Sequence, residues 1–404
     1  MTPFSYRCTD CGRSFSRDEV RYLCPECGKT YRPGIPLVGV LEVVFDYAAI
    51  GRAFDRARPD WDLFCAVEKA FHPPIQVGNT PLCRVDRLAN SLGLPSLWVK
   101  NDGLNPSGSL KDRASFLVVA EARRLGMELI VAASTGNAAS ALAAVCAATD
   151  IKALIFVPEK APKAKLVQMV LYGATVVPIQ GTYDDAFALS LEYTDQRGGL
   201  NRNTAYHPLT IEGKKTVGLE IWAQLGFQVP EAILVSVGDG VIIGGVHKAF
   251  VDLQRAGLID RLPRLIGVQA ETSDAIHRYV ETGQYSDAPH PTTRADSISV
   301  TCPSNAHGAR RAILESRGLT LTVTDEAILD AQALLAGRTG IFTEPAGAAA
   351  LAGLVKLQAG PNRLATSGPV VILATGHGLK DVEAPLSRIS IPPAVAPVLA
   401  ELAL

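Results

Sequence analysis

Seven short runs rich in valine, isoleucine and leucine recur along most of the chain, and they constrain its fold more than any other feature. Without regular polar alternation, such runs are typical of strands buried on both faces of a parallel sheet. Segments with helical periodicity lie between them, so the pattern predicts an α/β protein with helices on both sides of its sheet. The apolar runs span 96–100, 129–134, 152–158, 174–179, 232–237, 264–270 and 369–375, and examples of the helical segments span 137–148, 160–172 and 213–225.

The bulk composition excludes several classes of protein. A chain of 404 residues is long enough for two or three domains with substantial cores. A net charge of −1 gives no electrostatic reason to expect a nucleic acid or a membrane as partner. The N-terminus lacks the apolar core of a signal peptide, and no stretch reaches the ~18 apolar residues of a spanning helix. The eight cysteines do not suggest a disulfide framework, so we expect a reducing, cytoplasmic location.

The first 36 residues have a composition of their own and end in the chain-breaking sequence RPGIP. They contain two Cys-x2-Cys-Gly motifs, Cys8 with Cys11 and Cys24 with Cys27, which are separated by twelve residues. Two such motifs can place four thiolates around one zinc ion, so the segment is predicted to be a zinc-ribbon-like unit. A ribbon that no longer holds metal is the alternative. In both cases its role is structural, because four thiolates leave no coordination position open for chemistry.

The stretch NPSGSLKDRAS, residues 105–115, places a single lysine at the start of a predicted helix. Its proline and glycine favour a tight loop, and Ser109 with Asp112 resembles a capping box. Lys111 then lies in the first helical turn, where the positive end of the helix dipole lowers the pKa of an ammonium group. This position favours a nucleophilic amine. The alternative is an exposed lysine at a helix start.

Three predicted strands end in loops that could bind one ligand, at 134–140, 236–245 and 373–381. Ligands of open α/β sheets bind beyond the carboxyl ends of the strands. The first loop offers polar groups at a helix start, which suit a carboxylate, and Gly238 and Gly240 of the second free backbone N–H groups for a phosphate. With Lys111 for a carbonyl, the loops favour pyridoxal phosphate carrying an amino acid. A nicotinamide nucleotide fits less well, because the glycine loop comes late and does not match that fingerprint.

Seven motifs, in the same order along the chain, resemble those of the fold-type II pyridoxal-phosphate enzymes and, within them, the threonine synthases. The resemblance implies a fold like that of the tryptophan synthase β subunit, with two three-layer domains rich in parallel strands and, as in this branch, a cysteine-bearing ribbon in front. It also implies a homodimer. The expected division is a ribbon at 1–36, a large cofactor-binding domain at 37–100 with 206–404, and a smaller α/β domain at 101–205. The motifs are VGNTPL (77–82), NPSGSLKDRAS (105–115), STGNAASALAA (134–144), HPLTIEGKKT (207–216), the glycine loop 238–245, IFTEPAGAAALAG (341–353) and LATGHGLKD (373–381).

The resemblance also implies roles for residues at the matching positions. Lys111 would carry the cofactor through a Schiff base and then move protons, and Asn137 would bind the phenolic oxygen of the cofactor. Thr375 would face the pyridine nitrogen, where a hydroxyl favours elimination and replacement over transamination. The backbone amides that would hold the cofactor phosphate are those of Gly238, Asp239, Gly240, Val241 and Ile242. The loop that would bind the substrate consists of Ser134, Thr135, Gly136, Asn137 and Ala138.

The implied enzyme is a carbon–oxygen lyase that converts O-phospho-L-homoserine and water to L-threonine and phosphate. Two alternatives remain. One is a related β-elimination or β-replacement enzyme that acts on serine, threonine, diaminopropionate or, like cysteate synthases, on O-phosphoserine. The other is a non-catalytic cofactor-binding or regulatory protein whose ribbon recruits a partner, although the combination of Lys111, Asn137 and Thr375 argues against it.

Two departures from the family pattern concern phosphate binding. The family loop is commonly rich in asparagine where this chain has Asp239, Val241 and Ile242. An arginine that often helps bind the substrate phosphate is replaced within the segment 187–189, Phe-Ala-Leu. The residues that could supply positive charge instead are Arg113, Lys214 and Lys215.

Overall fold

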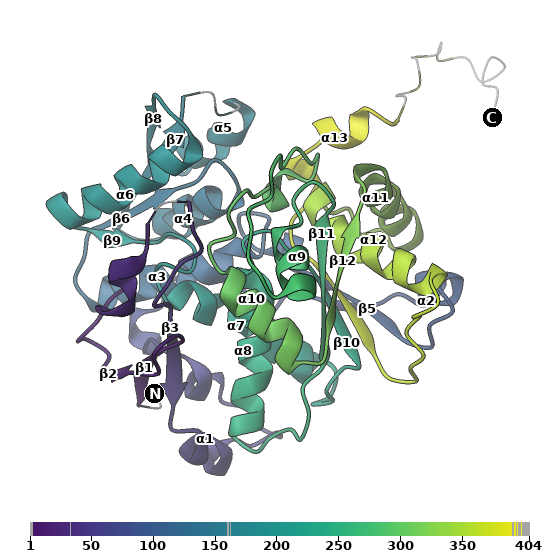
Figure 1. Ribbon diagram of the computed structural model, residues 1–404, viewed down its shortest axis with the longest axis horizontal. Coiled ribbons are helices and arrows are strands. Elements are labelled where there is room, and N and C mark those ends of the chain that lie inside the picture. The colour runs from purple at the N-terminus through teal and green to yellow at the C-terminus, as the bar shows by residue number, and fades with distance from the viewer. Residues whose placement is uncertain are drawn as a thin grey trace.

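The computed structural model describes residues 3–32, 34–159, 161 and 163–389, together with 392, 394 and 397. It confirms the predicted α/β architecture, in which parallel-rich sheets are covered by helices (Figure 1). Met1, Thr2 and Pro33 of the expected ribbon, and Lys160 and Pro162 of the helix expected at 160–172, lie outside the described residues.

The larger sheet has six strands, of which all but one run parallel. β4 is the exception, because it pairs antiparallel with β5. The central strands β10 and β13 are buried at every residue, as their uniformly apolar sequences predict. In spatial order the strands are β12 (Leu319–Val323), β11 (Arg264–Ala270), β10 (Ala232–Ser236), β13 (Val370–Ala374), β5 (Leu97–Asn101) and β4 (Leu82–Arg84).

Helices cover both faces of this sheet, so the unit has three layers. Successive residues of β10 point to opposite faces, and Ile233 and Leu234 belong to different hydrophobic cores. The core that contains Ile233 includes α7 (Leu209–Gln224), α8 (Val241–Arg255) and α10 (Ala306–Glu315). The core that contains Leu234 includes α2 (Asp86–Ser91), α11 (Asp325–Thr339) and α12 (Pro345–Ala359). Three shorter helices also belong to this part of the chain, namely α1 (Tyr47–Ala53), α9 (Ala275–Thr282) and α13 (Glu383–Leu386).

The smaller sheet has four parallel strands and is also sandwiched between helices. Its spatial order is β8 (Thr175–Ile179), β7 (Lys152–Pro158), β6 (Leu129–Ala133) and β9 (Leu200–Asn201). One face packs on α6 (Tyr183–Arg197) and the other on α4 (Asn137–Ala147) and α5 (Lys163–Leu171). The helix α3 (Lys111–Arg124) packs against both α4 and α7 and so lies between the two units.

The N-terminal segment forms a three-stranded antiparallel sheet in the order β2 (Ser14–Phe15), β1 (Phe4–Cys8) and β3 (Leu41–Phe45). β3 pairs with β1 along its whole length, so this sheet extends beyond the boundary that we predicted at residue 36. β5 of the larger sheet ends at Asn101, one residue beyond the boundary expected between the large and the small domain. We keep that three-part division as a proposal.

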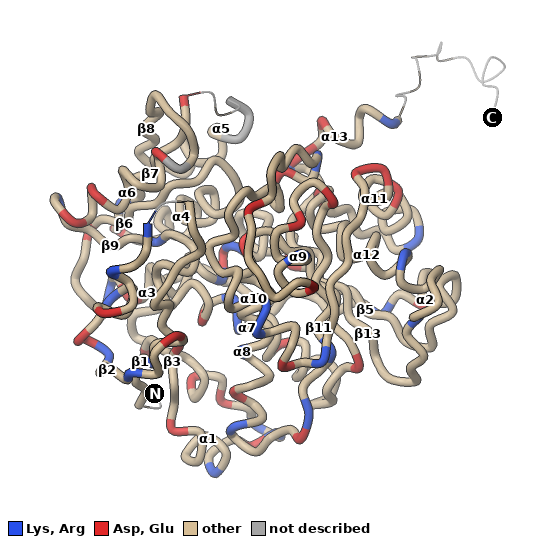
Figure 2. The backbone as a smooth tube through the Cα atoms, in the orientation of Figure 1, with Lys and Arg blue, Asp and Glu red and all other residues tan. Residues whose placement is uncertain are grey.

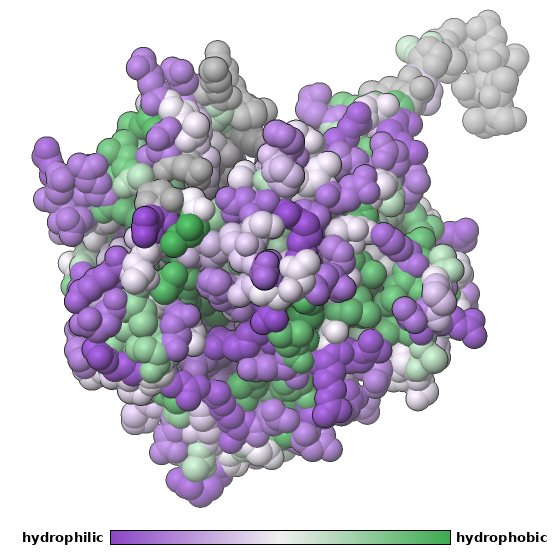
Figure 3. Space-filling view, viewed as in Figure 1, coloured by the Kyte–Doolittle hydropathy of each residue, from purple (hydrophilic) through white to green (hydrophobic). Residues whose placement is uncertain are grey.

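Acidic and basic residues are interspersed along the chain (Figure 2), and the face shown in Figure 3 is mostly hydrophilic with scattered apolar residues. Within the described part of the chain, every helix is too short or too polar to cross a lipid bilayer.

Candidate active site

Lys111 is the first residue of α3, as predicted, and backbone hydrogen bonds hold the preceding loop against the end of β13. The N–H of Leu110 donates to the carbonyl oxygen of Thr375 at 2.8 Å, and the N–H of His377 donates to the carbonyl oxygen of Gly108 at 2.8 Å. These bonds join segments that are more than 250 residues apart in the sequence. They fix the start of α3, and therefore Lys111, beside Thr375.

The capping interaction that we predicted at the start of α3, between Ser109 and Asp112, is wrong, because Asp112 binds a different serine. Asp112 accepts hydrogen bonds from the backbone N–H of Ser107, at 2.7 Å, and from the Ser107 hydroxyl, instead of pairing with Ser109. Gly108 has a φ of +85°, and this left-handed turn brings Ser107 back over the helix start. Burial raises the pKa of Asp112 to about 6. The Ser109 hydroxyl is buried and has no partner within the described part of the chain.

A cavity between the two larger sheets brings the proposed cofactor residues together. Its lining includes Lys111, Asn137, the loop 238–242 and Thr375. Thr375 follows β13, and loop 238–242 joins β10 to α8, so both lie beyond the carboxyl ends of neighbouring strands, as expected for an α/β ligand site. A wider outer cavity shares Asn137 with it and leads to the surface.

The environment of Lys111 favours an unprotonated amine. Burial lowers the pKa of the Lys111 ammonium, and the nearby guanidinium of Arg202 lowers it further. Asp239 and Glu344 act in the opposite direction, because negative charge stabilises an ammonium ion. The main cause of the shift is therefore desolvation, whereas the sequence pointed to the helix dipole. A Schiff-base lysine requires a reactive amine of this kind.

The loop before α8 has the shape of a phosphate cradle. Gly240 is the N-cap residue of α8 and has a φ of +80°. A Cβ atom at this position would lie 2.7 Å from Cβ of Ala309 and 2.9 Å from the carbonyl oxygen of Asn305, so only glycine fits. The first backbone N–H groups of a helix have no intrahelical partners, and here they begin at Val241 beside the cavity. These donors fit a phosphate group.

Asn137 and Glu344 form a buried pair inside the cavity. The amide Nδ2 of Asn137 donates to both carboxylate oxygens of Glu344, at 2.8 and 3.0 Å, and to the hydroxyl of Ser297 at 3.2 Å. Burial raises the pKa of Glu344, although the hydrogen bonds from Asn137 lower it. The sequence did not identify Glu344 as a site residue. The sequence does contain a sign of this residue, because Glu344 comes directly before the Pro-Ala-Gly sequence that starts α12. It is the N-cap residue of that helix.

The loop proposed to bind the substrate opens α4 at the outer cavity. Thr135, Gly136 and Asn137 line that cavity, whereas Ser134 and Ala138 are not among its lining residues. The hydroxyl of Ser134 instead accepts a hydrogen bond from the N–H of Gly136 at 3.2 Å, which shapes the loop.

Lys380, which the sequence analysis did not single out, supplies a positive charge to the outer cavity. Its Nζ donates to the carbonyl oxygen of Ser107, the hydroxyl of Ser140 and Oε1 of Gln168, at 2.8, 3.1 and 2.8 Å. These acceptors are all neutral, so the ammonium charge has no ion-pair partner among the described residues that contact it.

Two of the three cations that we considered for phosphate binding are already paired. Arg113 is buried and forms salt bridges with Asp102 and Glu220. Lys215 forms salt bridges with Glu212 and Asp252. Both side chains hold helices together, and neither lines the cavities.

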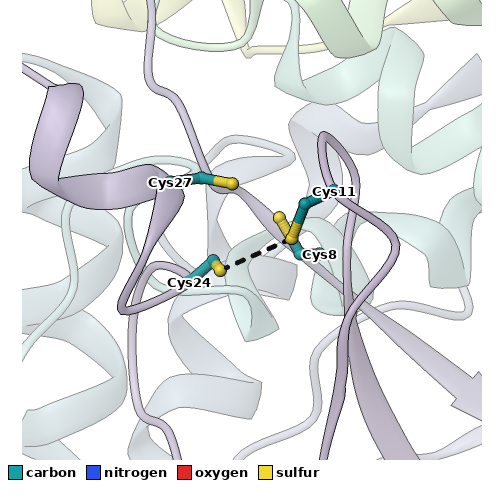
Figure 4. A group of neighbouring side chains, drawn as sticks. All are labelled: Cys8, Cys11, Cys24 and Cys27. Atoms are coloured by element: carbon teal, nitrogen blue, oxygen red, sulfur yellow. Dashed lines mark hydrogen bonds between the residues drawn. The ribbon is translucent and has the colours of Figure 1, made fainter.

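The four N-terminal cysteines lie together, as their spacing predicts. Their sulfur atoms all lie within 4.8 Å of one another, and Sγ of Cys11 is 3.9 Å from Sγ of Cys24 (Figure 4). Sulfur atoms of a tetrahedral zinc site, with Zn–S bonds of about 2.3 Å, are about 3.8 Å apart. The cluster is therefore compatible with a structural zinc ion.

Comparisons with known proteins agree with this site. Residues 74–376 match the model of a family described as pyridoxal-phosphate dependent enzymes. Threonine synthase of Methanosarcina acetivorans is 38% identical over 94% of this chain and 92% of its own length. Threonine synthase of Methanocaldococcus jannaschii is 36% identical over 94% of this chain and 93% of its own length. The chain belongs to the threonine synthase family of pyridoxal-phosphate-dependent enzymes.

Membership of this family confirms the expected enzyme class, a pyridoxal-phosphate-dependent lyase. Solved structures of other proteins share the fold. The processed form of threonine deaminase isoform 2 from Solanum lycopersicum matches with a TM-score of 0.64 and 24% identity, over 74% of this chain and 83% of that chain. Maize serine racemase matches with a TM-score of 0.65 and 22% identity, over 74% of this chain and 88% of that chain. Both likenesses concern the fold alone.

Proposed function

We propose that this protein converts O-phospho-L-homoserine and water to L-threonine and phosphate, with pyridoxal phosphate bound to Lys111. The observation that carries the proposal is the identity of 38% to a threonine synthase over nearly the whole length of both chains. A cavity lined by Lys111, Asn137, Thr375 and a glycine cradle supports it.

In this reaction the amine of Lys111 takes the proton from Cα of the substrate and has to release it before it takes a second proton from Cβ. Protons returned to Cγ and Cα then balance the two that were removed. The lowered pKa of Lys111 suits this task, because an amine must be unprotonated to accept a proton. The cofactor, when bound, supplies the electron sink for these steps. Glu344 lies close enough to influence Lys111 electrostatically and fixes the amide of Asn137.

The substrate has two anionic groups, and we assign each to a different part of the outer cavity. The backbone N–H groups that open α4, within loop 134–138, would bind the carboxylate. Lys380 would attract the phosphate, because its ammonium group donates hydrogen bonds only to neutral acceptors. Departure of phosphate from Cγ and addition of water at Cβ complete the reaction.

The proposal includes three further features. Cys8, Cys11, Cys24 and Cys27 hold a structural zinc ion, for which the clustering of their sulfur atoms is the support. The protein is a homodimer, and it acts in the cytoplasm on a small amino-acid substrate without a nucleic-acid or membrane partner.

The purified protein tests the proposal directly. We expect it to be yellow and to release phosphate and threonine in equal amounts from O-phosphohomoserine. Lys111→Ala should lose both the absorbance of the bound cofactor and turnover, whereas Lys152→Ala, which changes an exposed lysine, should keep both. Formation of keto acid and ammonia from serine or threonine, without threonine formation, would favour the ammonia-lyase alternative. A protein that stays colourless with added cofactor would favour the regulatory alternative.

A further inference from the structure

Lys214 of α7 is a fully buried lysine that forms no salt bridge within the described part of the chain. Its Nζ has no hydrogen-bond partner among the residues that the structure describes. Burial lowers the pKa of Lys214 well below its usual value, and the positive charges of Lys111 and Arg202 lower it further. A buried ammonium ion without a partner is strongly destabilising, and such groups occur where a ligand supplies the missing charge.

Close helix packing places Lys214 between the two elements that carry the cofactor site. A Cβ atom on the preceding residue, Gly213, would lie 2.2 Å from the carbonyl oxygen of Arg113, so α7 touches the first turn of α3. A Cβ atom on Gly245, in the second turn of α8, would lie 2.8 Å from Cβ of Lys214. Lys214 therefore lies between the helix that begins with Lys111 and the helix that begins at the phosphate cradle.

Arg202 adds a second buried positive charge to the same region. Its Nε and Nη1 make only long hydrogen bonds, to Ser115 at 3.2 Å and Thr204 at 3.4 Å, and Nη2 has no partner within the described part of the chain. Burial lowers the pKa of Arg202 to about 10. Lys111, Lys214 and Arg202 thus bring three cationic groups together, whereas Asp239 is the carboxylate that offsets the charge of both lysines.

We propose that Lys214, supported by Arg202, is the counter-ion of the cofactor phosphate in the cradle at residues 238–242. A phosphate monoester dianion would supply the negative charge that this buried region lacks. The proposal also accounts for Asp239 in a loop that receives an anion, because Lys214 offsets its charge. Lys214 lines neither cavity, but it packs against α8, which begins at the cradle, so the cofactor is the favoured source of the phosphate.

This proposal rests on the proposed cofactor and goes beyond it, because it assigns a side chain to a phosphate that backbone amides alone were expected to hold. It also separates Lys214 from Lys380, to which we assign the substrate phosphate. Substitution of Lys214 should therefore weaken binding of the cofactor, whereas substitution of Lys380 should weaken binding of the substrate.

The test removes the cofactor from the full-length natural protein, Lys214→Met, Lys214→Arg and the control Lys152→Met, and then measures ligand binding to each by equilibrium dialysis at pH 7.5. Two ligands are used, pyridoxal phosphate and pyridoxal, which differ only in the phosphate. We expect Lys214→Met to raise the dissociation constant of pyridoxal phosphate about tenfold or more and that of pyridoxal less than twofold, since it removes a charge-assisted hydrogen bond. Lys214→Arg should recover part of the affinity, and Lys152→Met should leave it unchanged.

A second measurement covers the case in which a substitution weakens the fold. Without cofactor, Lys214→Met should melt at a higher temperature than the natural protein, because it removes an unpaired buried charge. Added pyridoxal phosphate should raise the melting temperature of the variant less than that of the natural protein.

Three outcomes would overturn the proposal. They are an unchanged affinity for pyridoxal phosphate, an equal loss of affinity for both ligands, or a raised KM for O-phosphohomoserine with unchanged cofactor affinity. In the last case the cation would serve the substrate. These failures differ from failure of the proposed function, in which the natural protein would bind no cofactor or form no threonine.

Discussion

His207 shows how strongly burial acts on a single residue of this protein. It is almost completely buried just before α7, where its Nδ1 accepts a hydrogen bond from the N–H of Leu209 at 3.2 Å. Its Nε2 has no partner in the described structure. Burial lowers the pKa of His207 to about 4 from an ordinary value of 6.5. The folded protein therefore holds this imidazole in its neutral form at pH values where the unfolded chain would protonate it.

This shift predicts acid sensitivity with a defined sign. Above pH 6.5 the histidine is neutral in both states, and between pH 6.5 and 4 only the unfolded chain gains the proton. The free energy of unfolding should therefore fall by roughly 3 kcal/mol as the pH falls through that window. His207→Asn, whose carbonyl oxygen can accept the same hydrogen bond, should flatten this part of the pH profile. Urea unfolding at several pH values measures both proteins, and parallel profiles would contradict the assignment.

At the scale of single elements, the N-terminus of α8 makes the sharpest prediction. Gly240 and Gly257 lie at opposite ends of this helix and have φ values of +80° and +71°. Alanine at Gly257 would meet no atom within 4 Å, whereas alanine at Gly240 would overlap Ala309 and Asn305. Gly257→Ala should cost about 1 kcal/mol of stability from backbone strain alone, and Gly240→Ala about 2–4 kcal/mol because overpacking is added.

Chemical denaturation compares the two variants, and cofactor titration gives a second readout. Gly240→Ala should weaken pyridoxal phosphate binding, because the cradle has to move away from α10, whereas Gly257→Ala should not. Equal stability losses in the two variants would show that the close packing around Gly240 is not what requires glycine there.

The core strands could be predicted well because their apolar composition indicates that they are buried. Each uniformly apolar run became a strand whose ends differ from the prediction by at most one residue. β12 escaped that search, since its sequence LTLTV alternates apolar and polar residues, as an edge strand does. β3 was not predicted either, because it pairs with β1 and these two strands lie on opposite sides of the cysteine motifs in the sequence.

A site residue could be predicted only where a reactive or polar side chain lies in a motif that also marks a strand end or a helix start. Lys111, Asn137 and Thr375 each belong to a recognisable strand end or helix start, and the structure brings them to one cavity. Glu344 was missed although its position before the Pro-Ala-Gly start of α12 is a signal in the sequence. Arg202 was missed, since its importance depends on its burial without a salt bridge in the described structure, which only the packed structure reveals. The partner of Asp112 was mistaken for the same reason, because a glycine turn decides which serine reaches it.

At the scale of the whole molecule, the cysteine-bearing segment contacts both larger units. Arg17 forms salt bridges with Glu68 and with Glu121 of α3. The hydroxyl of Tyr22 accepts a hydrogen bond from the N–H of Asn201 in β9 at 2.9 Å. The segment therefore supports the helix that carries Lys111 and the edge of the smaller sheet.

Loss of the metal should therefore affect the stability and the activity of the whole protein as well as the ribbon itself. Cys11→Ser should remove the bound zinc, lower the free energy of unfolding by at least about 2 kcal/mol, and reduce turnover, since the ribbon braces α3 and β9. Cys83→Ser, which changes a cysteine outside the cluster, should retain about one zinc ion per chain and full stability. Metal analysis and thermal melting measure both variants. A natural protein that contains no zinc would mean that the cysteines are a vestige of a metal site.

The position of β13 has a consequence for how the protein is made. Of the strands that the structure describes, β13 is the last to leave the ribosome, yet it lies between β10 and β5 in the centre of the larger sheet. Until it is synthesised, the strands on its two sides have no neighbour to join them, and Leu110 has no carbonyl oxygen of Thr375 to bind. A nascent chain therefore cannot capture its vitamin cofactor in the finished geometry until β13 and Thr375 have been synthesised.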